Sequence, residues 1–168
     1  MNIFFLHWNP KQCAEMHCNA HVIKMILETC QLLCSAHHMT NSTFNPPYKL
    51  THKNHPCAVW TRESKPNYEW LCELGCALCV EYNFRYGKRH KCEIPIRALR
   101  LYIPPLPEHG FTLPAQAMPD DYKEEDPVQA YRAYYSGEKR GIKMFSWEGK
   151  VGRRSIPSWV QVSDNLMC

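Results

Sequence analysis

The strongest constraint on the fold is a long helical pattern near the start of the chain. Asn9-Pro10 is a good helix start, with Asn as the N-cap and Pro at the first helical position. Apolar residues then recur with the spacing of one helical face, so we expect a first helix from about Lys11 to His37. A helix of this length must bury its apolar face against other elements, which favours a helical core.

The stretch HCNAHVIKMILE, residues 17–28, places reactive side chains along one edge of this helix. At about 100° per residue, four of them fall within an arc of about 60°, namely His17, His21, Lys24 and Glu28. The apolar residues of the stretch fall on the opposite side. Such a stripe has three interpretations: a capped polar helix edge, a metal site, or a catalytic site without metal.

The two histidines have the i, i+4 spacing of helical metal ligands, but this spacing is a weak signal without a third ligand. We therefore expect a site without metal or cofactor, in which His17 and His21 keep the Lys24 amine neutral and nucleophilic. Such an amine can attack an electrophilic sugar carbon, and Glu28, one turn away, can transfer protons. The sequence predicts that this stripe lines a cleft.

The rest of the chain predicts further helices joined by long loops. We expect a short helix at 58–62, a second main helix at 66–86, and a third that starts after Asp126-Pro127 and ends at Gly137. A proline-rich wrap covers 93–125, and a basic aromatic tail covers 138–168, with Trp147 and Trp159 as docking points. The predicted fold is mainly α: a single compact domain of about three main helices with long proline-rich loops, its helical core at about 9–92 and 126–137.

Ten cysteines in a chain without an export signal indicate a reducing, intracellular compartment. Cys72, Cys76 and Cys79 have the spacing of an iron–sulfur cluster motif, but they lie in a continuous helical pattern. We therefore expect three core thiols, without a disulfide or a cluster. No apolar run approaches the roughly 20 residues of a membrane span, so no membrane partner is expected.

Two basic runs with interleaved aromatic residues favour a polyanionic partner. The runs are RYGKRHKCEIPIRALR and EKRGIKMFSWEGKVGRR, with six Lys/Arg in each. Glu81 and Arg85, at i and i+4, also predict a structural ion pair. The candidate contacts to nucleic acid are His55, Arg62, Arg85, Lys88, Arg89, His90, Arg132, Tyr135, Lys139, Arg140 and Lys143.

Four stretches together resemble the pyrimidine-dimer DNA glycosylases of the endonuclease V type: MNIFFLH, the polar-striped helix, YKLTHKNHP and EYNFRYGKRH. The resemblance covers roughly residues 1–92. It implies an all-α protein that binds damaged duplex DNA and uses an amine nucleophile with a helix-borne glutamate. The amine of that family is the N-terminus after removal of methionine, which adds Met1 to the candidate nucleophiles.

This chain departs from the family pattern in two places. AHVIKMILE lacks the Arg-Glu pair of the family's first helix, and Asn2 is a poor residue for methionine removal. The whole chain is also similar to uncharacterised proteins of large DNA phages and viruses, which implies the cytoplasm or nucleus of a host cell.

The leading hypothesis is a DNA glycosylase, with or without a following lyase step, that acts on a damaged or modified base in duplex DNA. Extrusion of the base would be required, because the glycosidic carbon is shielded in the stack. Two alternatives stay open: a non-catalytic binder of nucleotides or nucleic acid, and a metal-dependent nuclease on His17 and His21.

Overall fold

The structure is a computed structural model that describes residues 1–160. Within that range it is built from helices, and its only β-pairing is an isolated bridge between Glu148 and Arg153. The mainly α fold class is therefore confirmed. The elements are α1 (Pro10–Met16), α2 (Asn19–His38), α3 (Pro56–Glu63), α4 (Lys65–Tyr86), α5 (Glu93–Leu101), α6 (Pro127–Ser136) and the 3₁₀ turns η1 (Asp120–Tyr122) and η2 (Glu138–Gly141).

Four helices begin with the same local signal, a side-chain cap followed by proline. The caps of α1, α3, α4 and α6 each accept a hydrogen bond from a backbone N–H of the first turn. This satisfies donors that a helix start leaves without intrahelical partners. The predicted starts of α1, α4 and α6 are confirmed on this basis, and the caps are Asn9, His55, Ser64 and Asp126.

The prediction of one continuous first helix is wrong. The chain is extended at His17 and Cys18, which separate α1 from α2. The tail of the protein occupies this break: the Asn19 N–H donates to Ser146 O at 2.7 Å, and Trp147 Nε1–H donates to Met16 O at 2.9 Å. These bonds satisfy backbone groups at the two helix ends, so the break is stabilised by distant residues.

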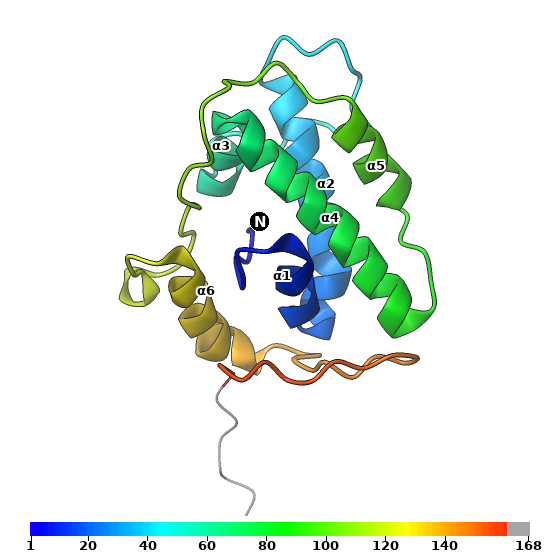
Figure 1. Ribbon diagram of the computed structural model, residues 1–168, viewed down its shortest axis with the longest axis vertical. Coiled ribbons are helices and arrows are strands. Elements are labelled where there is room, and N and C mark those ends of the chain that lie inside the picture. The colour runs from blue at the N-terminus through cyan, green and yellow to red at the C-terminus, as the bar shows by residue number, and fades with distance from the viewer. Residues whose placement is uncertain (161–168) are drawn as a thin grey trace, which may run out of the picture.

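The two long helices, α2 and α4, cross at the centre and carry the other elements (Figure 1). They approach closely at Gly75, where an added Cβ would lie 3.0 Å from Thr29 Cγ2. Helices α1 and α5 pack on α4, and α3 packs at one end of the pair. The N-terminal arm, residues 1–6, enters the middle of this arrangement, and its apolar side chains join the core.

The predicted wrap is wrong for its first nine residues, which form α5. Pro95 lies in the first turn of this helix, where the N–H that proline lacks has no intrahelical partner in any case. The rest of the wrap, 102–125, does run around the outside of the molecule from α5 past α3 to α6 (Figure 1). It is tied to α3 by Trp60 Nε1–H, which donates to Thr112 O at 3.2 Å.

The basic tail closes the fold along the C-terminal end of α4. An added Cβ at Gly149 or Gly152 would lie 2.5 Å from a carbonyl oxygen of Arg85 or Phe84, so glycine allows the close approach. Trp147 is buried, as expected of a docking residue, and Trp159 is partly buried. The last eight residues of the predicted tail, 161–168, lie outside the described part.

The nine cysteines of residues 1–160 are free thiols, and all but Cys76 are buried. Cys72 and Cys79 pack in the core on α4, as the helical pattern predicts, whereas Cys76 is partly exposed. In the same part of the chain, no helix combines the length and the hydropathy that crossing a bilayer would require.

Candidate active site

The N-terminal arm holds the first residues of the chain against α2. Ile3, Phe4, Phe5 and Leu6 are each at most 3% exposed. Burial of four large apolar side chains anchors a segment that would otherwise fray. Met1 and Asn2 are consequently held at one place beside α2.

Glu28 of α2 contacts the first two residues of the chain. Its Oε2 lies 4.0 Å from the Met1 amine nitrogen and accepts a 3.1 Å hydrogen bond from the Asn2 backbone N–H. Its other oxygen, Oε1, lies 3.6 Å from Lys24 Nζ. One carboxylate thus faces both of the amines that the sequence offers as nucleophiles.

The two amines have different surroundings. The Met1 side chain is 3% exposed, whereas the Lys24 side chain is 68% exposed. The expectation that His17 and His21 enclose Lys24 is therefore wrong, because both rings turn into the core while the ammonium group lies in solvent. Of the two amines, it is therefore the one at the chain terminus that has enclosed surroundings.

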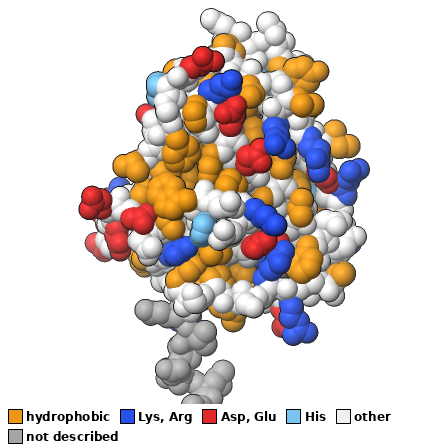
Figure 2. All heavy atoms as spheres, in the orientation of Figure 1, with side chains coloured by type: hydrophobic (Ala, Val, Ile, Leu, Met, Phe, Trp, Pro, Cys, Tyr) orange, Lys and Arg blue, Asp and Glu red, His pale blue; other side chains and the backbone are white. Residues whose placement is uncertain are grey.

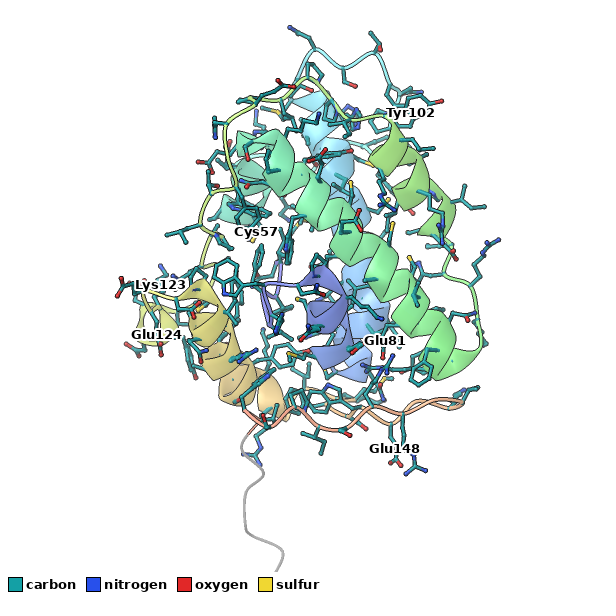
Figure 3. The ribbon with its side chains drawn as sticks, viewed as in Figure 1. Cys57, Glu81, Tyr102, Lys123, Glu124 and Glu148 are labelled. Atoms are coloured by element: carbon teal, nitrogen blue, oxygen red, sulfur yellow. The ribbon has the colours of Figure 1, made fainter. Side chains whose placement is uncertain are left out.

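Asn2 is a functional candidate that the sequence analysis missed. Its Oδ1 accepts hydrogen bonds from the Tyr131 hydroxyl at 3.0 Å and the Cys57 thiol at 3.5 Å, and its Nδ2–H donates to Ala117 O at 2.9 Å. Figure 3 labels Cys57 at the start of α3, beside the arm. These partners come from α3, the wrap and α6, so no local pattern in the sequence could reveal them.

His55 lies next to the same amine and carboxylate. Its Nδ1 accepts the Cys57 N–H at 3.1 Å, which caps α3. Burial lowers the pKa of His55, and so do the charges of the N-terminal amine and His52, whereas the charge of Glu28 opposes this shift. A neutral ring whose Nδ1 is an acceptor carries its proton at Nε2, so His55 presents a hydrogen-bond donor.

His17 and His21 belong to the core instead. His21 stacks on Phe4 with ring centroids 4.4 Å apart, and its Nδ1 bonds to the Tyr135 hydroxyl at 2.8 Å. His17 Nδ1 lies 2.7 Å from Cys13 O. Burial lowers the pKa of His17 to about 4 and that of His21 to about 3. Both rings are therefore neutral fillers of an aromatic cluster at neutral pH.

The four predicted stripe residues do not line one cleft. His17 is outside α2, His21 is buried, and only Lys24 and Glu28 meet. A groove of about 510 Å³ runs between α1, α4 and α5, but its lining residues do not include any of the four. No group of three His, Cys, Asp or Glu side chains within residues 1–160 is arranged as a metal site.

Two of the predicted DNA contacts are wrong because their side chains are fully buried. Arg85 donates to Glu81 at 2.7 Å, to Asn19 Oδ1 at 3.0 Å and to Glu15 O at 3.0 Å. This confirms the structural Glu81–Arg85 pair, which Arg154 of the tail extends by donating to Glu81 Oε1 at 3.0 Å. Tyr135 is at 0% exposure, and its hydroxyl contacts the thiol of Cys18 at 3.2 Å.

The arginines that follow α4 and lie on α5 are matched by carboxylates. Arg89 and Arg97 both bond to Glu93 at 3.0 Å, and Arg100 pairs with Glu73 at 2.6 Å. Figure 2 shows Lys/Arg and Asp/Glu side chains interspersed on this face. Lys88 is exposed beside them, and His90 is partly buried with its Nδ1 accepting the Cys92 N–H.

The cations after α6 lie nearer to α2. The Ala20 N–H donates to Met144 O at 3.3 Å, which places the segment with Lys143 beside the start of α2. Lys139 lies over the Tyr134 ring at 5.0 Å, Arg140 is partly buried, and Lys143 is exposed. Two other candidates are occupied or enclosed: Arg132 donates to Leu6 O at 2.9 Å, and Arg62 is partly buried in α3.

Comparison with known proteins identifies the segment that carries this site. A family model described as pyrimidine dimer DNA glycosylase matches residues 1–94. No curated protein and no solved structure gives a significant match. The matched segment contains the N-terminal arm, Glu28, His55 and all of α4. Since it spans more than half of the 168 residues, the chain belongs to the pyrimidine dimer DNA glycosylase family.

Proposed function

We propose that this protein removes a damaged or modified base from duplex DNA through an amine nucleophile, and then cuts the strand as a lyase. Membership of a DNA glycosylase family supports DNA as the substrate. The observation that carries the proposal is the approach of the chain's terminal amine to Glu28 Oε2, at 4.0 Å. An amine beside a helix-borne carboxylate provides a nucleophile and a proton-transfer group at one point.

The reaction that this pair supports has a defined electron and proton balance. The neutral amine attacks C1′ of the target nucleotide, and the glycosidic bond breaks with its electron pair on the base, which takes a proton from solvent water. The Glu28 carboxylate accepts the proton that the attached amine releases and gives it to O4′ as the C1′–O4′ bond breaks, leaving an iminium and a carboxylate again. Loss of a 2′ proton allows the 3′ phosphate to depart, which cuts the strand.

The terminal α-amine is the better candidate for nucleophile. The terminal amine lies at a buried side chain beside Glu28, whereas Lys24 Nζ projects from an exposed one. If Met1 is removed in the mature protein, the nitrogen of Asn2 becomes the amine, and it is 3.1 Å from Glu28 Oε2.

The surrounding groups are suited to holding DNA at this amine. His55 offers a fixed Nε2–H donor for a phosphate or a departing base. We assign the phosphate contacts chiefly to Lys24, Lys139 and Lys143, because the segment after α6 lies beside the start of α2. Lys88 and Arg89 lie at the far end of α4 and would contact DNA only outside the damaged site.

Borohydride trapping tests the proposal, because it captures only an iminium between protein and DNA. The substrates are duplexes that carry a single abasic site or a single pyrimidine dimer, with an undamaged duplex as control. We expect a covalent adduct with the native protein and Lys24→Ala, and strong loss of the adduct in Glu28→Gln. Binding without an adduct would instead support the non-catalytic binder, and cleavage that depends on added metal would support the nuclease.

A further inference from the structure

The amine that we propose as nucleophile is held by a hydrogen-bonded clamp on Asn2. Chain termini are ordinarily the least ordered part of a domain. Here the Asn2 carboxamide is bonded on both of its ends: Oδ1 accepts from Tyr131, from Cys57 and from the Ile3 N–H at 2.8 Å, and Nδ2 donates to Ala117 O. The backbone N–H of the same residue is directed at Glu28. Holding the side chain therefore sets the position of the Asn2 nitrogen, which either is the reacting amine or lies one residue from it.

Tyr131 is the hub of this clamp. Its hydroxyl has one proton, which Asn2 Oδ1 at 3.0 Å and Ala115 O at 2.7 Å share as acceptors, and its oxygen accepts the Ala117 N–H at 3.2 Å. One phenol thus ties the arm to the wrap, which itself binds the Asn2 amide through Ala117. Tyr131 is at 0% exposure, and burial raises its pKa well above the usual value, so the hydroxyl stays a neutral donor.

Apart from Cys57 and Ile3, the partners of Asn2 in this clamp come from a part of the chain that the family match does not cover. The match ends at residue 94, whereas the wrap follows α5 and Tyr131 lies on α6. We propose that Tyr131 is a positioning residue that acts through the Asn2 carboxamide to fix the terminal amine at Glu28, so that the wrap and α6 complete the active site. This inference rests on the proposed function for its catalytic consequence, but the position of the amine can be measured without DNA.

The test compares Tyr131→Phe with a matched control, Tyr135→Phe. Both tyrosines lie on α6, both are fully buried, and both lose only a hydrogen-bonded hydroxyl. The Tyr135 hydroxyl serves Cys18 and His21 rather than Asn2. Neither substitution alters residue 2, so removal of the initiator methionine is unaffected, and intact mass verifies that the variants share one N-terminus.

Two readouts separate the clamp from the proposed chemistry. The first is the rate at which an amine-selective ester acylates the terminal amine without DNA, followed on the N-terminal peptide by mass spectrometry. The second is the single-turnover rate of borohydride trapping on abasic-site DNA, with DNA affinity measured by anisotropy. Poor placement of a reacting group by about 1 Å can cost about 100-fold in rate, so even partial loosening should be measurable.

We expect Tyr131→Phe to acylate faster than the native protein and to trap at least about tenfold more slowly, at unchanged DNA affinity. Tyr135→Phe should match the native protein in both rates, although its melting temperature also falls. Equal rates in the two variants would overturn the inference. If the native protein does not trap, the proposed function fails, and the acylation rates still decide the clamp. Asn2→Leu, which removes the other partner of the bond at similar size and is as poor a residue for methionine removal as Asn, serves if Tyr131→Phe does not fold, again with intact mass to verify the N-terminus.

Discussion

Replacement of Glu28 by glutamine tests the proposed acid–base residue with little change of shape. The amide keeps an oxygen that can accept the Asn2 N–H, which is 3.1 Å from Oε2 in the native protein. It cannot give or take a proton at the reacting atoms. General acid–base catalysis contributes about 10²- to 10⁴-fold, so the single-turnover rate should fall by that factor, or by about 2.7 to 5.4 kcal/mol in the barrier.

The stability of this variant should change far less. The partner in the Glu28–Lys24 pair is 68% exposed, and exposed pairs contribute about 0 to 1 kcal/mol. Glu28 also contacts the terminal amine and the Asn2 N–H, and weakening these contacts raises the expected decrease in the free energy of unfolding to about 1 to 2 kcal/mol. Urea unfolding measures this difference, and a gel assay on abasic-site duplex measures the rate.

Glu93→Gln is the matched control. Glu93 is 13% exposed, close to the 12% of Glu28, and it also bonds to two cations, Arg89 and Arg97. Its substitution should cost similar stability and leave the rate unchanged. A Glu28→Gln rate within about threefold of native, or an equal loss in Glu93→Gln, would refute the assignment, because acid–base catalysis should contribute far more.

Three further predictions concern the identity of the nucleophile, the binding of DNA and the stability of the protein at low pH. Lys24→Ala should keep its trapped adduct and bind DNA only slightly more weakly in an anisotropy titration; loss of the adduct would move the nucleophile to Lys24. Charge reversal at Lys139 and Lys143 should lower the slope of log K against log salt by about 0.9 for each phosphate that the protein no longer neutralises, and an unchanged slope would place the DNA elsewhere. His17 and His21 have lowered pKa values of about 4 and about 3 in the folded protein, against about 6.5 unfolded, so stability is full above pH 6.5 and falls as pH drops toward 4. The melting temperature of the native protein should follow this course, and that of His21→Leu should fall less. An equal fall in the two proteins would show that other groups titrate.

Much of the fold was predictable because short local sequence signals mark where its helices begin. Asn9-Pro10 and Asp126-Pro127 mark two starts, and Gly87, in the left-handed region at φ 63°, ends α4. The break between α1 and α2 could not be predicted, since the apolar periodicity continues through it. It depends on Ser146 O, which reaches Asn19 from the other end of the chain.

The site was predictable in part. The spacing of Lys24 and Glu28 correctly brings an amine to a carboxylate, and the family resemblance adds the chain terminus. The histidines of the stripe misled the interpretation because a polar ring buried against Phe4 looks the same in sequence as one in a cleft. The role of Asn2 depends on Tyr131, more than 100 residues away, and only the folded chain brings them together.

The most direct measurement of the central claim is a peptide map of the borohydride-trapped complex on abasic-site DNA. Digestion of the protein and the DNA leaves a reduced sugar remnant on one nitrogen, and mass spectrometry locates it. We expect the remnant on the α-amine of the first residue, Met1 or Asn2, next to Glu28. A remnant on Lys24, or trapping that survives after the terminal amine has been acylated, would contradict it.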